Sequence, residues 1–493
     1  MLDPGLRIIF VFLVALFSSM FVLPKLARIA KAIGLLDKAA EKRKVHKMPR
    51  PLVGGIGIII AATFSSLILV PITGLRGYFL GLSVLLLIGF FDDFKELGHK
   101  QKFFAQIVAT LLLMYFSKAY LLTFGNLLGL GAIDLPDIPW IVWGMTIFCV
   151  VGVINAVNLI DGLDGLAGGV AFVAFLTFAI HASMTGDATL MLLNLALAGA
   201  VLGFLRFNWY PSAMFMGDAG SLCLGFSLAF MALALTQGSN SGVSPVCSLL
   251  VLAVPITDTV TVMAKRMLRG QSPFKADQYH LHHIFMRYGM GRVLVVKVIV
   301  GITILLSGIS LLGPVYKVPD VYLFGAFLLY FCIYIGASFC IIHTMRFSLK
   351  YKKKNAERDG VALWLRRILG GELKLFSIFR KSPRYAVRLT LVCRENERHL
   401  DFHGTVLNIS NDGFMASLPD LDNLLDRVVA KITFPMDKES LTLELPAEHL
   451  WVTEEGKKRF HGFRFLEFDG GQEQVVFKFL VKFRKNESSG LSE

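Results

Sequence analysis

The sequence predicts a polytopic α-helical membrane protein of about 11 transmembrane helices, with a small cytoplasmic β-barrel domain at its C-terminal end. Three observations predict this fold class. The 493 residues are 55% hydrophobic and only 17% charged, whereas soluble chains carry roughly 25% charged residues. The charged residues are distributed unevenly. Residues 1–345 hold 24 Lys and Arg and 15 Asp and Glu, whereas the much shorter segment 346–493 holds 26 Lys and Arg and 21 Asp and Glu. Short β-like runs separated by turn sequences begin only near Tyr385.

The apolar segments give the number and direction of the spans. A spanning helix needs about 20 mainly apolar residues, and eleven such segments are centred near residues 15, 62, 83, 112, 147, 175, 198, 228, 254, 304 and 333. Basic residues gather in the loops 25–50, 95–102 and 265–297. Since Lys and Arg are enriched in cytoplasmic loops, we expect an external N-terminus and a cytoplasmic tail.

The composition also predicts the domain boundaries. We expect a membrane domain over residues 1–345, a basic juxtamembrane linker over 346–379 and a soluble domain over 380–493, which is long enough to bury its own core. The six Cys show no CxxC spacing, so neither disulfides nor structural zinc are indicated. The net charge of +14 lies largely in short loops and linkers, which argues against a nucleic acid polymer as a partner.

Carboxylates at the ends of spans need an explanation, because an Asp near the bilayer costs roughly 2.5–3.5 kcal/mol. Asp92 and Asp93 are adjacent at the end of an apolar segment. Adjacent carboxylates repel unless a cation lies beside them, and Mg²⁺ binds one or two carboxylates together with substrate phosphates. A solvated pair at a helix end is the alternative.

Two further acidic groups follow. Asn158, Asp161 and Asp164 recur every three residues, so in a helix they would share one face, and the glycines between and after them allow a ligand to approach the backbone. A turn with a helix cap would explain only part of this set. Asp218 lies at the start of a later span and is a third candidate site carboxylate; the alternative is that it only caps the N-terminus of that helix.

Two basic loops accompany the carboxylates. The loop 37–51 contains Arg43 and His46, and the segment 255–283 contains Arg266 and ends in His280, His282 and His283. Zinc binding is the first alternative for the histidines. However, His280 and His282 are two positions apart and His282 and His283 are adjacent, a spacing that suits a tetrahedral zinc site poorly. We expect cationic loops that bind a diphosphate or a sugar, with membrane topology or a structural loop as the remaining explanations.

Taken in order, these motifs resemble the polyprenyl-phosphate N-acetylhexosamine-1-phosphate transferases, of the bacterial undecaprenyl-phosphate GlcNAc-1-phosphate transferase type. The resemblance implies transfer of GlcNAc 1-phosphate from a UDP-sugar to undecaprenyl phosphate in the bacterial inner membrane, with release of UMP and with Mg²⁺, or alternatively Mn²⁺, as cofactor. It implies catalytic roles for Asp92, Asp93, Asp161 and Asp164, and a metal site at Asp218, Asp92 and Asn158. Its implied substrate-binding residues are Lys102, Asn158, Arg43, His46, Arg266, His280, His282 and His283.

The tail carries a second resemblance. Arg380 and Arg384 form an RxxxR pattern, and Asn408, Ser410 and Gly413 form an NxSxxG pattern two expected strands later. In this order the patterns resemble a PilZ domain, the bacterial receptor for cyclic di-GMP, which implies that these five residues bind the dinucleotide. Arg384 and Arg388 fit the same spacing, and a PilZ-like fold without dinucleotide binding is the alternative.

The expected function is therefore a transferase that initiates a lipid-linked cell-surface polysaccharide, such as an exopolysaccharide or the O-antigen of lipopolysaccharide, under control of cyclic di-GMP. A lipid or solute transporter gated by the tail is the alternative. Transporters place ionisable residues near the middle of the bilayer, whereas the acidic groups here fall at span ends. The identity of the hexosamine, the direction of regulation and the oligomeric state, a homodimer included, stay open.

Overall fold

The structure is a computed structural model, and it divides the chain into two compact units, residues 1–364 and 365–493, which are described separately. In the first unit it describes residues 3–37, 49–95, 97–237, 242–268, 270, 280–287 and 290–351. In the second it describes residues 385–395, 401–410, 413–418, 427–435, 440–455, 458–466, 476 and 479.

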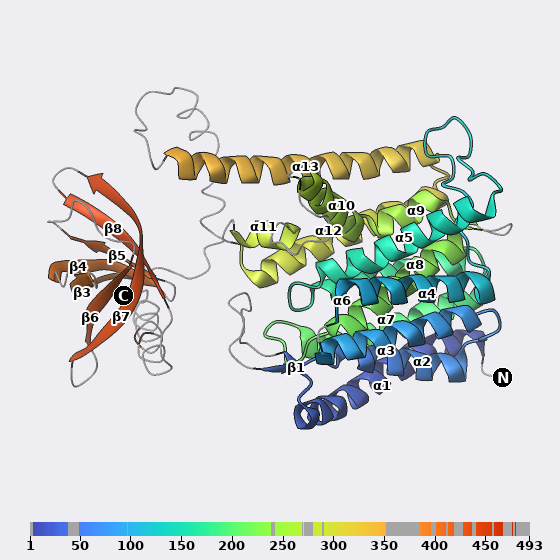
Figure 1. The fold of residues 1–493 in the computed structure, drawn as a ribbon, viewed down its shortest axis with the longest axis horizontal. Helices are drawn as coiled ribbons and strands as arrows, with labels where there is room; N and C mark the ends of the chain where they lie inside the picture. Colours follow the sequence, from blue (N-terminus) through green and yellow to red (C-terminus); the bar gives the residue numbers. More distant parts are fainter. Residues whose placement is uncertain are drawn as a thin grey trace, which may run out of the picture. The chain divides into compact units, whose positions relative to one another are not determined.

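The first unit is a bundle of helices, with one short two-stranded antiparallel sheet (Figure 1). Its strands are β1 (Leu36–Asp37) and β2 (Arg50–Pro51). Its helices are α1 (Pro4–Ile33), α2 (Gly54–Leu69), α3 (Arg76–Lys95), α4 (His99–Ser117), α5 (Pro139–Ile160), α6 (Leu166–Met184), α7 (Ala188–Asn208), α8 (Gly217–Thr236), α9 (Pro245–Val251), α10 (Ala253–Met267), α11 (Leu281–Arg287), α12 (Arg292–Val315) and α13 (Asp320–Tyr351).

The unit is a polytopic membrane region, but fewer helices qualify as spans than the sequence predicts. Among the described residues, seven helices are long and apolar enough to cross a membrane, or eight if α9 and α10, bent by 77°, form one broken span. The expected eleven is therefore not reached. The helix α2 has only 16 residues, the first turn of α4 is polar, and the described apolar part of α13 is short.

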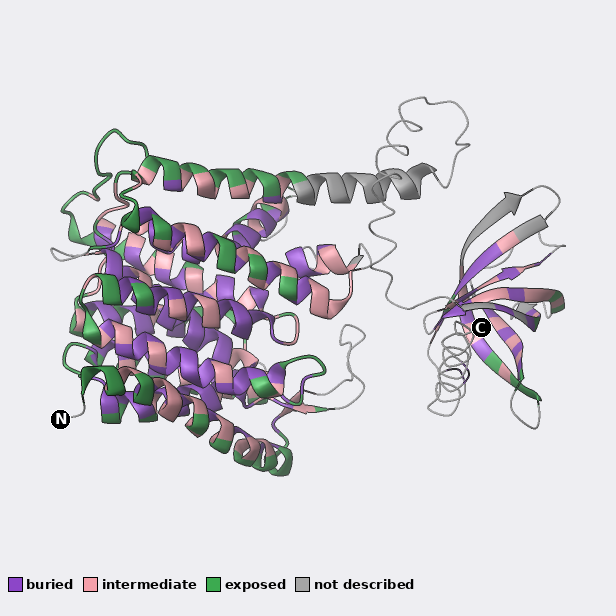
Figure 2. Ribbon diagram, turned by 180° about the vertical axis from the view of Figure 1, so that it is seen from behind, coloured by how far each residue is buried: buried purple, intermediate pink, exposed green. Residues whose placement is uncertain are grey.

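The helix α8 lies at the centre of this unit. It packs against α2, α3, α5 and α6, and 89% of its most apolar stretch is buried, compared with 22% for α1 (Figure 2). Small residues let the helices approach closely: Gly55 of α2 meets Gly220, and Gly89 of α3 meets Ala219. The ends of several helices are thereby fixed relative to the first turn of α8.

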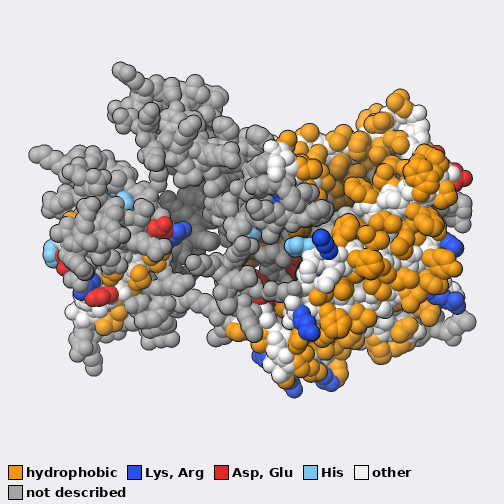
Figure 3. Space-filling view, viewed as in Figure 1, with side chains coloured by type: hydrophobic (Ala, Val, Ile, Leu, Met, Phe, Trp, Pro, Cys, Tyr) orange, Lys and Arg blue, Asp and Glu red, His pale blue; other side chains and the backbone are white. Residues whose placement is uncertain are grey.

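The outer surface of the helical unit is apolar, as a lipid-facing surface requires. Large hydrophobic side chains such as Phe17, Phe104 and Phe148 are exposed. Apolar side chains also cover most of the face of this unit that is drawn in Figure 3. Exposed apolar area of this extent is rare on soluble proteins and marks contact with a membrane or a partner.

The second unit is a closed barrel of six antiparallel strands in the order β3-β4-β5-β8-β7-β6. The strands are β3 (Tyr385–Glu395), β4 (Asp401–Ser410), β5 (Gly413–Ser417), β6 (Arg427–Pro435), β7 (Ser440–Glu455) and β8 (Lys458–Phe465). Alternate apolar residues fill the interior, where the rings of Phe414 and Phe463 stack with centroids 4.8 Å apart. The expected small β-barrel is confirmed. The helix expected near 474–485 lies outside the described residues, except for Val476 and Phe479, which are helical and buried in the barrel core.

Candidate functional site

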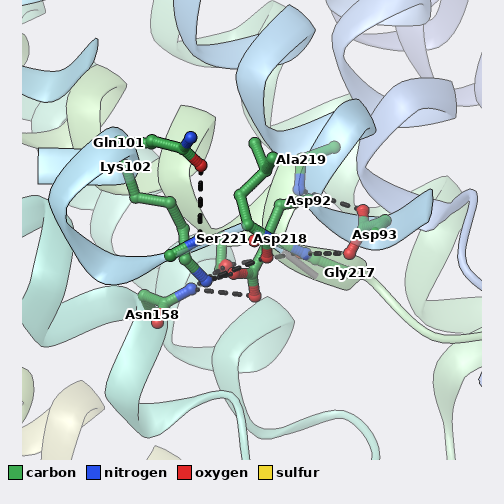
Figure 4. Close-up of polar contacts among 11 residues, drawn as sticks. Asp92, Asp93, Gln101, Lys102, Asn158, Gly217, Asp218, Ala219 and Ser221 are labelled. Carbon is green, nitrogen blue, oxygen red and sulfur yellow. Dashed lines mark hydrogen bonds and ion pairs between the residues drawn. The ribbon is translucent and has the colours of Figure 1, made fainter. Parts of the chain in front are cut away.

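Four helix ends meet at one place in the helical unit and bring together polar residues from distant parts of the sequence. Asp92 and Asp93 lie in the last turn of α3, Lys102 lies in the first turn of α4, Asn158 lies near the end of α5 and Asp218 lies at the start of α8. Figure 4 shows their side chains converging. These five expected site residues form one connected set of hydrogen bonds around Asp218.

The centre of this cluster is the ammonium group of Lys102. Its Nζ lies 2.9 Å from Oδ2 of Asp92 and 2.7 Å from Oδ2 of Asp218. The second oxygen of Asp92 accepts the Leu97 amide at 2.7 Å. The second oxygen of Asp218 accepts from Nδ2 of Asn158 at 3.2 Å. Both carboxylates are therefore held in place and share one cation.

Asp93 has a different environment from its neighbour. Its carboxylate accepts the backbone amides of Asp218 at 2.8 Å and Ala219 at 3.2 Å. Those amides belong to the first turn of α8, whose N–H groups have no partner within the helix and favour a negative charge. Gly217, with φ of +74°, makes the turn into the helix. Asp93 thus fixes the helix end that carries Asp218.

Asp164 contacts Arg50 and Ser212, not Lys102. Its Oδ2 lies 3.3 Å from Nη1 of Arg50 and accepts the Ser212 amide at 3.2 Å. Arg50 also donates to Oγ of Ser212 at 2.5 Å and lies over the ring of Phe215. Gly54 donates its amide to the Phe215 carbonyl at 2.9 Å. This contact set ties the segment before α2 to the segment that leads into α8.

The expected shared helical face for Asn158, Asp161 and Asp164 is wrong. The helix α5 ends at Ile160, and a turn follows in which Gly165 has φ of +80°. Asn158 therefore points to Asp218, while Asp164 points to Arg50. Asp161 lies just beyond the helix, where burial and then the negative charges of Asp218 and Asp164 raise its pKa to about 7.

The histidines form a third polar group. Nδ1 of His280 lies 2.9 Å from Oδ2 of the buried Asp258, whose other oxygen accepts the Tyr334 hydroxyl at 2.6 Å. The ring of His282 is nearly parallel to that of His280 and lies against Gly162, where a Cβ atom would overlap it.

His282 is neutral and buried. Burial, with a smaller effect of His283, lowers its pKa to about 3. Neither of its ring nitrogens has a hydrogen-bond partner among the described residues. Arg266, also buried, lies in the last turn of α10. Since Gly162 follows Asp161, the His282 ring borders the acidic turn after α5.

Several predicted residues are not part of this geometry. Arg43, His46, Arg380 and Arg384 lie outside the described residues. In the barrel, Asn408 and Ser410 are on β4, and Gly413 begins β5. Oγ of Ser410 donates to the Gly413 carbonyl at 3.1 Å, which closes the turn between the two strands.

Four contributors were not predicted as site residues: Arg50, Ser212, Ser221 and Tyr334. Arg50 lies in the basic loop that was expected to bind an anion, where nothing in the sequence set it apart from its neighbouring cations, and Tyr334 is in an apolar run 76 positions from Asp258. Ser221, which accepts from Asn158 at 2.8 Å, is one turn after Asp218, and that spacing was the available clue.

The donor atoms suit a hard divalent cation. Two carboxylate oxygens, Oδ2 of Asp92 and of Asp218, converge on one point, while Nδ2 of Asn158 donates to the other oxygen of Asp218, so the Asn158 amide oxygen would have to turn toward an ion to bind it. Mg²⁺ needs no more from a protein when phosphate oxygens and waters complete its octahedron. Within the described ranges, no group of three or more His, Cys, Asp or Glu side chains is arranged to hold a metal without ligands from a substrate or water, and His280 is engaged with Asp258.

Comparisons with known proteins agree on two parts of the chain. Residues 75–236 match the family described as Glycosyl transferase family 4, and residues 379–482 match the PilZ domain. The chain is 34% identical over 309 residues to a probable undecaprenyl-phosphate N-acetylglucosaminyl 1-phosphate transferase of Bacillus subtilis (strain 168), covering 61% of this chain and 83% of the relative. It is 32% identical over 322 residues to the undecaprenyl-phosphate alpha-N-acetylglucosaminyl 1-phosphate transferase of Escherichia coli (strain K12), covering 64% and 85%.

Two solved structures resemble part of the chain. One is the inhibitor of motility of Bacillus subtilis, with 18% identity and a TM-score of 0.20 over 22% of this chain and 52% of that one. The other is the PilZ domain of YcgR from Escherichia coli with c-di-GMP, with 15% identity and a TM-score of 0.20 over 23% of this chain and 98% of that one.

Proposed function

This chain belongs to glycosyl transferase family 4 and carries a PilZ domain, and from that premise we propose that it transfers N-acetylhexosamine 1-phosphate, with GlcNAc as the first candidate sugar, from a UDP-sugar to undecaprenyl phosphate. The observation that supports this proposal best is the convergence of Asp92, Lys102 and Asp218 at one end of a bundle with an apolar outer surface. Such a site is available both to a membrane lipid and to a water-soluble nucleotide sugar.

The proposed reaction is a direct displacement. An oxygen of the lipid phosphate forms a bond to the sugar-linked phosphorus of the UDP-sugar, and the bond from that phosphorus to the bridging oxygen breaks, so that UMP leaves with the electron pair. A phosphate monoester has a second pKa near about 6, so the lipid phosphate is already largely a dianion at neutral pH. No side chain is then needed as a covalent nucleophile or as a strong base.

The side chains act mainly by binding and orientation, as is usual in phosphoryl transfer. We propose that Asp92, Asp218 and Asn158 would hold Mg²⁺, with Mn²⁺ as a substitute, and that the ion supplies charge neutralisation to the diphosphate and to the leaving UMP. Asp93 fixes the start of α8. Lys102, Arg266 and Arg43 would contribute cations for the phosphates, and His46, His280, His282 and His283 would contribute hydrogen-bonding groups for the sugar nucleotide.

We also propose the finer topology that the sequence predicts. Adding α2, α4 and α13 to the eight candidate spans gives eleven crossings, an odd number that places the two termini on opposite sides. The basic loops favour a periplasmic N-terminus and a cytoplasmic PilZ domain in the bacterial inner membrane. Cyclic di-GMP would then bind Arg380, Arg384, Asn408, Ser410 and Gly413 and regulate the initiation of a cell-surface polysaccharide.

The test is release of UMP by the purified full chain in detergent, with undecaprenyl phosphate, UDP-GlcNAc and magnesium. Asp218→Asn should lower the rate by about 100-fold or more, because removing a preorganised charge at a reacting phosphate typically costs several kcal/mol. Asp187→Asn, which alters the N-cap of α7, is the matched control and should keep the rate. Full turnover by Asp218→Asn, or no UMP from any UDP-hexosamine, would contradict the proposal.

A further inference from the structure

The ammonium group of Lys102 occupies the position that the proposed function assigns to the metal ion. The two oxygens that converge there, Oδ2 of Asp92 and Oδ2 of Asp218, both contact Nζ, at 2.9 and 2.7 Å. Mg²⁺ binds oxygens at about 2.0–2.1 Å. An ion that close to both oxygens leaves no room for the ammonium group between them.

Each of the other carboxylate oxygens in this cluster already accepts a hydrogen bond from a nitrogen other than Nζ of Lys102. Oδ1 of Asp92 accepts the Leu97 amide at 2.7 Å, and Oδ1 of Asp218 accepts from Asn158 at 3.2 Å. Asp93 is engaged with the amides of Asp218 and Ala219. The two oxygens that already converge are the Oδ2 pair, so an ion that bridges Asp92 and Asp218 there takes the atoms that Lys102 holds.

We propose, on the basis of the proposed function, that Lys102 competes with the metal ion for Asp92 and Asp218 and is displaced when the ion binds. Its ammonium group keeps the two carboxylates together as a monovalent substitute for the ion. A Lys side chain can leave that position because its charge sits at the end of a flexible four-carbon stem. Lys102 is in this sense a positioning residue for the metal site.

The competition couples metal binding to substrate binding. Displacing the ammonium from two carboxylates is costly unless another anion is within its reach, because an unpaired charge in a partly buried site is unfavourable. A diphosphate bound on the metal provides that anion, and the side chain of Lys102 is only 19% exposed. The ion should therefore bind more tightly when the nucleotide sugar is present, and by reciprocity the sugar should bind more tightly with the ion.

A direct metal-binding measurement tests the inference without reference to turnover. Mn²⁺ is titrated into the full chain in detergent, without nucleotide or lipid, and the free ion is followed by electron paramagnetic resonance. The site in question is the one lost in Asp218→Asn. In Lys102→Met this site should bind Mn²⁺ about tenfold more tightly, because a competing positive charge a few ångströms away has been removed.

Three variants complete the design. Lys102→Arg keeps the charge and the donors and should keep the affinity of the unmodified chain. Lys100→Met removes an exposed cation two positions away on the same helix and measures the long-range effect of charge alone. Lys102→Gln is a second neutral variant, for use if Lys102→Met does not give folded protein by size-exclusion chromatography.

The outcomes separate this inference from the proposed function. Weaker or unchanged Mn²⁺ binding in the neutral variants, with UMP release intact in the unmodified chain, would overturn the competition and leave the transferase proposal standing. A gain in Lys100→Met equal to that in Lys102→Met would also overturn it. No Mn²⁺ binding at this site in any variant would contradict the proposed metal site itself, and the inference with it.

Discussion

At the scale of single residues, Asp92 and Asp93 are adjacent in the sequence but serve different groups. Asp92 contacts the Lys102 ammonium, whereas Asp93 accepts two backbone amides at the start of α8. Asp92→Asn should therefore lower UMP release by about 100-fold or more, with little loss of stability. Asp93→Ala should in addition lower the free energy of unfolding by about 0.5–2 kcal/mol, the usual range when Ala replaces a side chain that caps a helix N-terminus.

Thermal unfolding in detergent and UMP release, measured on the same preparations, check these two expectations. The separation of the two effects is the informative result. If both variants lost activity and stability to the same extent, the distinction between a metal-facing and a helix-capping carboxylate would be wrong.

Asp161 should make stability depend on pH. Its pKa in the folded protein is about 7, well above the value of about 3.9 for an unperturbed Asp. The folded chain therefore holds this proton more tightly, so the stabilisation is complete below about pH 4 and is lost as the pH rises through 7. Asp161→Asn has no proton to lose, so the unmodified chain should become less stable relative to this variant between about pH 5 and 8.

The measurement is the midpoint of thermal unfolding of both proteins across that pH range. Added magnesium should reduce the difference between them, because a cation near Asp218 offsets one of the charges that raise the pKa of Asp161. Parallel curves for the two proteins, without magnesium, would show that Asp161 does not titrate differently in the folded chain.

At the scale of elements, the position of α8 depends on contacts between small residues. A Cβ atom at Gly55 would overlap the backbone of Gly220, and one at Gly89 would overlap that of Ala219. Gly55→Ala or Gly89→Ala should force α8 away from its neighbours, at a cost of about 1–3 kcal/mol for overpacking. Because the same helix end carries Asp218, UMP release should fall as well.

Gly152→Ala, on α5, is the matched control, because no atom other than its own helix backbone and chain neighbours lies within 4 Å of a Cβ added there. It should leave both stability and UMP release unchanged. Normal activity in Gly55→Ala and Gly89→Ala would mean that the start of α8 can shift without disturbing the site.

The comparison of sequence with structure is most instructive at this scale. Apolar runs locate helices well, because burial in lipid or protein selects for them. They did not indicate the 77° bend between α9 and α10, because an apolar run reports composition and not direction; the local signal was Pro255, which has no N–H to bond to the Val251 carbonyl. The three-residue spacing of Asn158, Asp161 and Asp164 predicts one helical face. The glycines in the same segment, which allow a ligand to approach the backbone, also favour the end of the helix, and α5 ends at Ile160.

The convergence of the polar residues could be anticipated only in part. Carboxylates at span ends are costly enough to be conspicuous in the sequence, and Asp92, Lys102, Asn158 and Asp218 do meet. Their individual roles stay predictions. The contact of Arg50 with Asp164 joins residues 114 positions apart, and no local pattern encodes such a pairing.

At the scale of the whole molecule, the chain combines a membrane transferase unit with a barrel that has its own closed core. The uneven charge along the sequence already separated the two parts, because lipid and water select different compositions. A family 4 transferase has no need of a PilZ domain for chemistry, since the polar cluster of the helical unit is formed by that unit alone. This independence is consistent with the regulatory role proposed for the barrel.

This arrangement predicts that dinucleotide binding and transfer can be separated by mutation. Arg384→Ala should weaken the binding of cyclic di-GMP by about tenfold or more, because a hydrogen bond to a charged group contributes about 1.5–3 kcal/mol. Lys431→Ala removes another cation of the barrel, one paired with Glu444 across β6 and β7, and should change the affinity by no more than about twofold, since exposed pairs contribute little.

Calorimetry on the full chain measures both affinities, and UMP release should respond to the dinucleotide in Lys431→Ala but no longer in Arg384→Ala. Equal affinities in the two variants would remove Arg384 from the site, and a barrel that binds no dinucleotide at all would leave the PilZ domain with an anchoring or partner-binding role.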